Sequence, residues 1–324
     1  FRPFLNDNDY ENYMVIIALG MSHAFGFGKG IVVNLTMGGT IFFAESLDEI
    51  LRVIEKYRPT VWPSVPLWMK LIATHEEYQK YDISSLKVIT CGSAPLPVDV
   101  IRRVEELTGA VITEGYGMTE TVNTITINGH DHRKVGTVGV VNPNIEYLIV
   151  DQETGTEVVE DGQPGEIICR GECVMHEYWN NPEETAKMLR NGWLYTGDIG
   201  RIDEEGFLII CDRKKDLIIT GGFNVFPSEL EAVAITAENV ADAIAIGVPN
   251  ERRGEVPAIF VQPIAGKTVD LNEVERVCRE KLSRFKVPKE YYIMDMLPKT
   301  KNRKPDRKMV KKLYLEHAFD DQKK

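Results

Sequence analysis

The sequence predicts an α/β protein, which is α+β when the chain is taken as a whole. A large amino-terminal lobe built on a parallel sheet should carry a small β-barrel-like subdomain and be joined by a hinge to a small α+β domain. Up to about residue 136, short apolar strands alternate with helices, which is typical of a parallel sheet flanked by helices. Beyond that point, short strands follow one another with only turn sequences between them. The 324 residues are enough for two domains.

The elements of the first part follow from hydrophobic periodicity. Helices are predicted where apolar residues recur three and four positions apart, and strands where short apolar runs end in turn residues. In chain order these are a strand at 38–43, a helix at 48–57, a strand at 60–62 closed by Pro63, a helix at 67–77, a strand at 86–90, a helix at 98–107 and a strand at 110–113.

The later elements follow from the same patterns. Strands are predicted at 145–151, 166–170, 207–211 and 217–220, then a helix at 228–235, strands at 241–248 and 258–263, and a helix at 271–282.

A charged segment at 212–216 separates two apolar runs and is followed by Gly221-Gly222 and by Pro227, which suits the first turn of a helix. This segment is either a joint between domains or a solvated turn inside one domain. We expect a joint, with domains at 1–214 and 215–324.

The composition excludes several classes of function. A net charge of −11 argues against broad binding of nucleic acid, although a local basic site remains compatible with it. The five cysteines form no CxxC pair and have no histidine at metal-binding spacing, which favours reduced side chains in a cytoplasmic protein. No apolar run is long enough to span a bilayer.

Two glycine-containing loops are candidates for ligand binding. Each follows the carboxyl end of a predicted parallel strand, where open α/β sheets bind ligands, and glycine permits close approach to the backbone. The loops contain Gly92, Ser93, Ala94 and Pro95, and Gly115, Tyr116 and Gly117. Tyr116 could offer a ring face to a base, Thr119 a hydroxyl to a phosphate, and Glu120 an oxygen to Mg²⁺. The alternative is a tight turn whose Thr-Glu pair caps the next helix.

Two charged residues are candidates for contacts with a ribose or a phosphate. Asp198, at the end of a turn after Trp193, could accept hydrogen bonds from a ribose diol, or it could only cap that turn. Arg213 could contact ribose or phosphate, or form a surface ion pair with Asp212 or Asp216.

A basic loop at 298–308 stands out in an acidic protein. A lysine on such a loop could stabilise negative charge that develops on a phosphoryl or carboxylate group. The alternative is a solvated basic tail that could contact an anionic surface.

Each of these motifs is weak singly, but their order is specific. They are Gly-Ser-Ala-Pro (92–95), Gly-Tyr-Gly-Met-Thr-Glu (115–120), Gly-Glu-Ile-Ile-Cys-Arg-Gly (165–171), Tyr-Thr-Gly-Asp (195–198), the segment 212–227 and Pro-Lys-Thr-x-x-x-Lys (298–304). From about residue 9 to residue 311 the series resembles the AMP-forming adenylating enzymes, which include acyl- and aryl-CoA synthetases, luciferases and the adenylation domains of peptide synthetases.

The resemblance implies a two-step reaction. ATP activates a carboxylic acid to an acyl-adenylate with release of pyrophosphate, and the acyl group then passes to a thiol with release of AMP. ATP/AMP, Mg²⁺ and coenzyme A are the implied cofactors. The carboxylic acid and CoA are the implied partners, no nucleic acid is expected, and a homo-oligomer is left open.

The resemblance also implies roles for single residues. Tyr116 would pack on adenine, and the loop from Gly92 to Pro95 would line adenine and substrate. The other implied roles are a phosphate contact for Thr119, Mg²⁺ binding for Glu120, ribose contacts for Asp198 and Arg213, catalysis of adenylation for Lys304, a hinge for Lys215, and positions at the acyl pocket for His23 and Trp62.

The chain departs from the family pattern in three places. Arg303 and Glu177 stand where glycine is common, and Pro305 stands where an aliphatic residue is common. The family's phosphate-gripping loop, rich in Ser, Thr and Gly, is not found ahead of His23. The resemblance therefore implies the carboxyl-terminal part of a longer enzyme, which by itself should not adenylate.

Three hypotheses of function follow. The leading one is an AMP-forming acyl-CoA synthetase, an acid–thiol ligase for a fatty or related carboxylic acid. The second is a stand-alone adenylating ligase that loads a carrier protein. The third is a nucleotide-binding remnant without catalysis. The sequence does not specify which acid is used.

Overall fold

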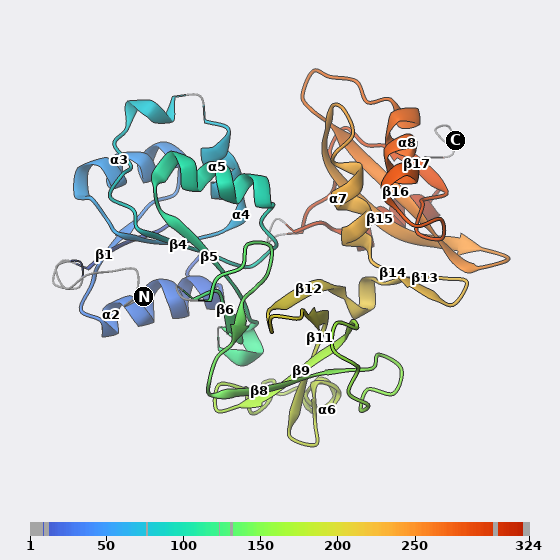
Figure 1. Cartoon of the computed structure of the whole chain (residues 1–324), viewed down its shortest axis with the longest axis horizontal. Coiled ribbons are helices and arrows are strands. Elements are labelled where there is room, and N and C mark those ends of the chain that lie inside the picture. The colour runs from blue at the N-terminus through green and yellow to red at the C-terminus, as the bar shows by residue number, and fades with distance from the viewer. Residues whose placement is uncertain are drawn as a thin grey trace. The chain divides into compact units, whose positions relative to one another are not determined.

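The computed structural model describes residues 9, 13–75, 77–122, 124–129, 132–300 and 304–319. The chain divides into two compact units, each with its own hydrophobic cores (Figure 1). Unit 1 comprises Phe1–Thr196 and Gly200–Ile210, and unit 2 comprises Gly197–Ile199 and Cys211–Lys324. The boundary predicted at residue 214 is also a predicted hinge. Both stay predictions, because a hinge requires motion between the two units.

The first sheet of unit 1 has seven strands in the order β2-β1-β3-β4-β5-β6-β7. The first five are parallel, whereas β6 and β7 are antiparallel to their neighbours. The strands are β1 (Met14–Ile17), β2 (Thr40–Phe43), β3 (Val61–Ser64), β4 (Val88–Cys91), β5 (Val111–Tyr116), β6 (Thr126–Ile127) and β7 (Val140–Val141). The central strands β3 and β4 are buried along their whole length, as expected of a parallel sheet that is covered on both faces.

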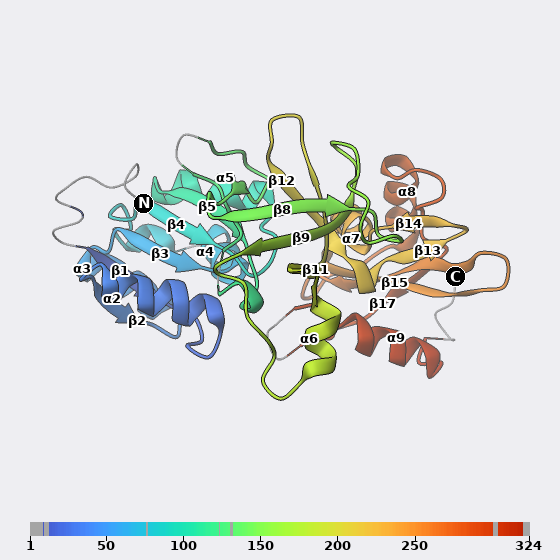
Figure 2. The same ribbon diagram turned by 90° about the horizontal axis from the view of Figure 1, so that it is seen from below.

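Helices cover the two faces of this sheet (Figures 1 and 2). They are the π-helix η2 (Phe25–Val32), α2 (Val33–Thr36), α3 (Leu47–Tyr57), α4 (Pro66–Ala73) and α5 (Val98–Thr108), with a short 3₁₀ turn η3 (Tyr78–Lys80). Apolar residues of α3, α4 and α5 pack with Ile16, Trp62 and Ile89 of the sheet in one core. On the other face, Gly30 of η2 comes so close to Ile17 that an added Cβ would lie 3.1 Å from its side chain.

Local chemistry explains where these helices begin and end. The Ser46 hydroxyl accepts a hydrogen bond from the Glu49 N–H and caps α3, and Gly109 ends α5 in the left-handed conformation (φ 70°) that glycine adopts without a steric penalty. Helix α4 ends at Ala73, earlier than the prediction of residue 77, because the polar Thr74, His75 and Glu77 do not continue its apolar face.

A second, curled sheet completes unit 1. Its strands run in the order β10-β11-β9-β8, and β12 pairs with β11. The elements are β8 (Ile145–Val150), β9 (Gly165–Gly171), helix α6 (Pro182–Met188), β10 (Leu189–Arg190), β11 (Trp193–Ile202) and β12 (Leu208–Arg213), whose last residues belong to unit 2. This is the barrel-like subdomain that the sequence predicts.

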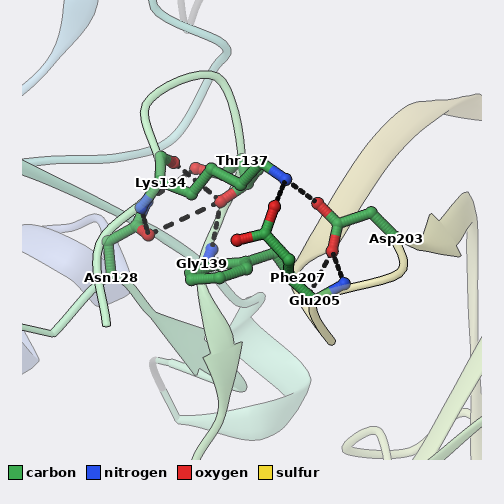
Figure 3. Close-up of polar contacts among 7 residues, drawn as sticks. All are labelled: Asn128, Lys134, Thr137, Gly139, Asp203, Glu205 and Phe207. Carbon is green, nitrogen blue, oxygen red and sulfur yellow. Dashed lines mark hydrogen bonds and ion pairs between the residues drawn. The ribbon is translucent and has the colours of Figure 1, made fainter. Parts of the chain in front are cut away.

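A polar network within unit 1 joins the two sheets (Figure 3). The Lys134 ammonium group donates to Asp203 at 2.8 Å and to Glu205 at 2.5 Å. Asp203 in turn accepts from the backbone N–H of Phe207 at 2.9 Å, and the Lys134 N–H donates to Asn128 at 3.1 Å. The segment after β6 is thereby fastened to the turn between β11 and β12.

Unit 2 is an α+β domain around a five-stranded sheet in the order β14-β13-β16-β15, with β17 parallel to β16. The elements are the 3₁₀ turn η5 (Lys214–Asp216), β13 (Ile218–Thr220), β14 (Phe223–Val225), α7 (Pro227–Ala234), β15 (Val240–Asn250), β16 (Gly254–Pro263), α8 (Leu271–Lys281), β17 (Glu290–Ile293) and α9 (Arg307–Leu315). Separate apolar clusters cover its two faces, one containing α7 and α8 and the other containing α9.

Several elements differ from the predictions. Strand β2 is half-exposed rather than buried, because it lies at the edge of its sheet. Pro63 lies inside β3 and does not end it. The pairing of β3 with β1 is limited to Val61, which is compatible with Pro63 because proline has no N–H to donate to a neighbouring strand. Helices η2 and α9 and strands β11 and β17 were not predicted. No helix in the described part of the chain is both long and apolar enough to cross a bilayer.

Candidate active site

The turn after β4 carries the first predicted nucleotide contacts. The Gly92 N–H donates to the carbonyl of Ser64 on the neighbouring strand at 3.3 Å. Ser93 has a φ of 74°, in the left-handed region that residues other than glycine seldom adopt. Ser93, Ala94 and Pro95 are exposed, so this turn presents its backbone and small side chains to solvent.

A partly buried carboxyl group at the end of β5 supports the same turn. The backbone N–H groups of Leu96 and Gly136 hydrogen-bond to Glu114. Burial raises the pKa of Glu114 to about 7, although these hydrogen bonds and the charge of Arg133 oppose the rise. The sequence analysis missed Glu114, because an acidic residue after a strand gives no sign of how deeply it will be buried.

The second predicted loop begins later than expected. Gly115 and Tyr116 belong to β5, where they pair with Ile127 and Thr126 of β6. A Cβ on Gly115 would lie 2.9 Å from the Thr126 carbonyl oxygen, so the close pairing of the strands requires glycine. The prediction of a loop at these two residues was wrong, because β6 is too short to be found from sequence, and the turn starts at the exposed Gly117.

Tyr116 lies largely in the core. Only 8% of the residue is exposed, and it clusters with Ile125, Ile149 and Leu194. A base could stack only on the small part of the ring that stays open, and the contact with adenine stays a prediction.

Glu120 is held by a segment that the sequence analysis did not include in the site. It belongs to the 3₁₀ turn η4 (Thr119–Thr121), in which Thr119 is exposed. The Tyr178 hydroxyl donates to Glu120 Oε1 at 2.5 Å, and the Met175 N–H donates to the Glu120 carbonyl at 2.7 Å. Burial and the bond to Glu120 raise the pKa of Tyr178, which therefore remains a donor near neutral pH.

The surroundings of Glu120 fit one kind of metal site. Across the described residues, no group of three or more His, Cys, Asp or Glu side chains could hold a metal by itself. Mg²⁺ in nucleotide enzymes takes one or two carboxylates and completes its shell with phosphate oxygens and water. A single oriented carboxylate at Glu120 therefore fits a magnesium ion that arrives with a nucleotide.

Asp198 and Arg213 form an ion pair between β11 and β12. The Arg213 Nε lies 3.2 Å from Asp198 Oδ1, and the Asp198 side chain is only 10% exposed. Asp198 lies within β11, so its predicted position in a turn was wrong. The alternative partner Asp212 does not form this pair: it accepts hydrogen bonds from the backbone N–H groups of Arg213 and Ser228, both at 2.8 Å.

Lys304 joins the same charge cluster in unit 2. Burial lowers its pKa, the positive charges of Arg213 and Lys215 lower it further, and Asp198 opposes the shift. The backbone of Lys304 is fixed by Thr300, whose N–H donates to the Lys304 carbonyl at 2.8 Å and whose hydroxyl accepts from the Lys304 N–H at 3.2 Å. Lys215, the predicted hinge, is exposed in η5.

The departures from the family pattern fall at different places. Arg303 lies outside the described residues. Pro305 forms an isolated bridge with Lys299, and Glu177 is exposed beside Tyr178.

The two predicted acyl-pocket residues differ in their exposure to solvent. His23 is exposed in the turn before η2, and its Nδ1 accepts from the Phe25 N–H at 3.1 Å. Trp62 is fully buried among the side chains of α3, α4 and α5, and its Nε1 has no hydrogen-bond partner in the described structure. A role for either residue at an acyl chain stays a prediction.

The predicted site residues thus form two groups, each within one unit. Unit 1 holds the turn at Gly92, the end of β5 and Glu120 with its tyrosine partner. Unit 2 holds the ion pair of Asp198 with Arg213 and the neighbouring Lys304.

Comparisons with known proteins show the family to which the chain belongs. Residues 5–179 match the model of the AMP-binding enzyme family, and residues 229–304 match the model of the AMP-binding enzyme C-terminal domain. A long-chain-fatty-acid–CoA ligase of Bacillus subtilis is 40% identical over 281 residues, which are 86% of this chain and 50% of the relative. The chain therefore spans about half the length of this curated relative.

Solved structures give the same result. The o-succinylbenzoate CoA synthetase of Bacillus subtilis, in complex with its acyl-adenylate, superposes with a TM-score of 0.84 at 28% identity, over 95% of this chain and 61% of that one. The amide bond synthetase McbA of Marinactinospora thermotolerans gives a TM-score of 0.84 at 30% identity, over 93% and 61% of the two chains.

Proposed function

Because this chain belongs to the AMP-binding enzyme family, we propose that the full-length protein is an AMP-forming acyl-CoA synthetase for a fatty or related carboxylic acid. The observation that carries the proposal is the charge cluster of Asp198, Arg213 and Lys304 in unit 2. It combines an acceptor for ribose hydroxyls with two cations for phosphate and carboxylate oxygens. The relative with 40% identity is named for a long-chain fatty acid, which supports that class of substrate.

In the first step, a carboxylate oxygen of the acid would attack the α-phosphorus of ATP while the bond to pyrophosphate breaks. Both reactants are anions, so the step needs positive charge near the reacting atoms. Lys304 is proposed to supply it at the carboxylate and the α-phosphate. Bound Mg²⁺ would neutralise phosphate charge, and Glu120, held by Tyr178, is its proposed ligand.

In the second step, the thiol of CoA would lose its proton to solvent and its sulfur would attack the acyl carbon. The bond between the acyl carbon and the phosphate oxygen would break, and AMP would leave with its electrons. Asp198 and Arg213 are proposed to hold the ribose of AMP during both steps, and Thr119 to contact phosphate. The domain boundary at residue 214 and a hinge at Lys215 are part of this proposal, because a rotation there would exchange Lys304 for a path to the thiol.

The test is to follow both half-reactions of the full-length protein separately. With ATP, Mg²⁺ and a long-chain fatty acid, we expect acid-dependent exchange of labelled pyrophosphate into ATP. Added CoA should then release AMP and form the thioester. Exchange that does not depend on any carboxylic acid would overturn the proposal, and a panel of aromatic and short-chain acids would identify the substrate class.

One observation favours a second candidate. The structural neighbour with 30% identity is named an amide bond synthetase, so a closely similar fold is associated with an acceptor other than CoA. The second candidate is a ligase that adenylates the acid and passes it to another acceptor, such as the thiol of a carrier protein. Replacing CoA with a phosphopantetheinyl carrier protein or an amine in the second step distinguishes the two.

A further inference from the structure

Arg307 occupies a junction that the proposed mechanism does not use. It is the first residue of α9 and follows Lys304 by three positions, and its side chain is only 18% exposed. One terminal nitrogen of the guanidinium group donates to both carboxylate oxygens of Glu231 at 2.7 Å. The other lies 3.9 Å from Asp216 Oδ2. Arg307 thus connects α9 with α7 and with the turn η5.

The Glu231 side of this junction is anchored in the core of unit 2. Glu231 Oε1 also accepts a hydrogen bond from the backbone N–H of Ala245 on β15 at 2.9 Å. Burial raises the pKa of Glu231 to about 7, while the charge of Arg307 acts in the opposite direction and Asp212 adds to the rise. A buried carboxylate is costly without a cation, so Glu231 depends on Arg307 to stay charged.

The Asp216 side of the junction is the proposed hinge. Asp216 directly follows Lys215 in η5. The strand before this turn is fixed to the start of α7, because the Ser228 hydroxyl donates to the Cys211 carbonyl at 2.6 Å and the Ser228 N–H donates to Asp212 at 2.8 Å. Arg307 therefore reaches a segment that is already attached to α7.

A short, well-defined path leads from Arg307 back to Lys304. The Asp306 carboxylate caps α9 by accepting from the Met309 N–H at 3.0 Å, and the Asp306 N–H donates to the Pro298 carbonyl at 2.9 Å. Pro305, which lies between Lys304 and Asp306, has a fixed φ. Together with the Thr300 hydrogen bonds to Lys304, these contacts hold the segment 304–306 to the segment 298–300. A shift of Arg307 would therefore shift Lys304.

We infer that Arg307 is a positioning residue for adenylation: through Glu231 and Asp216 it fixes the segment 304–306 to α7 and to the proposed hinge turn η5, so that Lys304 and this turn move as one piece. The inference rests on the proposed function, because that function gives Lys304 its role. The Arg307 side chain itself does not touch the reacting atoms. Its effect is on where Lys304 lies, and a displacement of about 1 Å can cost on the order of a hundredfold in rate.

A neighbouring ion pair on the same helix provides a matched control. Lys311, one turn further along α9, forms an ion pair with Glu255 of β16 at 2.9 Å. This pair also attaches α9 to the sheet, but it includes no residue of the proposed hinge turn η5 or of the segment 304–306. If Arg307 only stabilised α9, then Arg307→Ala and Lys311→Ala would have effects of the same kind.

The experiment compares Arg307→Ala, Arg307→Lys and Lys311→Ala in the full-length protein. We expect Arg307→Ala to lower kcat for acid-dependent pyrophosphate exchange by about a hundredfold, with a smaller change in KM for ATP. The thiol step, started from a synthetic acyl-adenylate and CoA, should change by no more than about twofold. Arg307→Lys should recover part of the loss, because lysine keeps the charge without the planar guanidinium group. Equal kcat values for Arg307→Ala and Lys311→Ala would overturn the inference.

A second measurement does not depend on activity. Hydrogen exchange should accelerate at the amides of Thr300, Lys304 and Asp306 in Arg307→Ala and stay unchanged in Lys311→Ala. If the unaltered protein forms no adenylate, the proposed function fails, yet faster exchange confined to these amides would still support the junction. Unchanged exchange at these amides would refute it. If Arg307→Ala does not fold, Arg307→Lys takes its place in both measurements, and a kcat equal to that of the unaltered protein would count against the inference.

Discussion

The two groups of predicted site residues are built on different physical principles. In unit 1 the turn at Gly92 and the end of β5 depend on backbone geometry: a left-handed Ser93, a glycine that a neighbouring strand requires, and a carboxyl group that burial favours in its neutral form. In unit 2 the site depends on charge. The positive charges of Arg213 and Lys215 contribute to the lowered pKa of Lys304, and the negative charge of Asp198 opposes them.

Because of this difference, substitutions in the two groups should affect different properties of the protein. An excess of positive charge favours the binding of an anionic ligand. Changes in the charge cluster should alter chemistry or ligand binding and leave folding largely intact. A site shaped by its backbone should respond through stability and through the placement of ligands.

Replacement of Lys304 by alanine should have the largest effect. Loss of a cation that faces developing negative charge typically costs on the order of 10²–10³ in kcat. We expect that loss in acid-dependent pyrophosphate exchange, with little change in the melting temperature. Lys312→Ala is the control, because Lys312 is an exposed lysine of α9 that lies 3.8 Å from Glu316. Exchange that proceeds equally well in both variants would remove Lys304 from the mechanism.

Replacement of Asp198 by asparagine should mainly weaken nucleotide binding. It removes the counter-charge of Arg213 and a charged acceptor for ribose, and a charge-assisted hydrogen bond contributes about 1.5–3 kcal/mol. That corresponds to roughly 10- to 100-fold in the Kd for AMP, which calorimetry would measure. Glu146→Gln, which breaks the exposed pair with Arg170, is the control. An unchanged Kd for AMP in Asp198→Asn would contradict the ribose contact.

Replacement of Glu114 by glutamine should change how stability depends on pH. Since the folded protein raises the pKa of Glu114 from 4.5 to about 7, it keeps a proton that the unfolded chain loses. This contribution to the free energy of unfolding is greatest below pH 4.5 and declines as the pH rises through 7, by about 2 kcal/mol between pH 5 and 7. Glutamine cannot titrate, so urea unfolding of Glu114→Gln should lack this decline.

The control for Glu114 is Glu106→Gln, which alters an exposed ion pair with Arg103 on α5. It should keep the pH dependence of the unaltered protein. Parallel pH profiles for Glu114→Gln and the unaltered protein would show that burial does not hold Glu114 in its neutral form.

Replacement of Tyr178 by phenylalanine should have the smallest effect. The variant loses the hydroxyl that orients Glu120, and partners that orient a metal ligand typically matter by 10- to 100-fold in metal affinity. We expect the lower end, about a tenfold higher Mg²⁺ concentration for half-maximal activity, because phosphate oxygens would supply other ligands. Tyr314→Phe, which removes a hydroxyl bonded to Glu290 in unit 2, should leave the Mg²⁺ dependence unchanged.

Much of the fold could be predicted, because hydrophobic periodicity is local. The helices at α3, α5, α7 and α8 and the strands at β4, β8, β9 and β13 lie within a few residues of their predicted positions. Elements with weak local signals were missed. The π-helix η2 contains three glycines, and β6 has only two residues, so neither produces a recognisable pattern.

The candidate site could be predicted in its parts but not in its contacts. Short motifs indicate Thr119, Glu120, Asp198, Arg213 and Lys304, because the residue types and their order along the chain are visible in the sequence. The partner of Glu120 lies 58 residues away at Tyr178, and the partner of Arg307 lies 76 residues away at Glu231. Such pairs carry no periodic signal.

The sequence by itself determined the fold class, the two-part organisation of the motifs and the residue types available for the chemistry. Only the tertiary structure decided how those residues are used. It buried most of Tyr116, it placed Glu114 where the Leu96 and Gly136 N–H groups bond to it, it turned Arg213 toward Asp198 instead of Asp212 or Asp216, and it connected the start of α9 with α7 and η5 through Arg307. The reason is physical: burial and electrostatic coupling depend on distances through space, which local patterns along the chain do not encode.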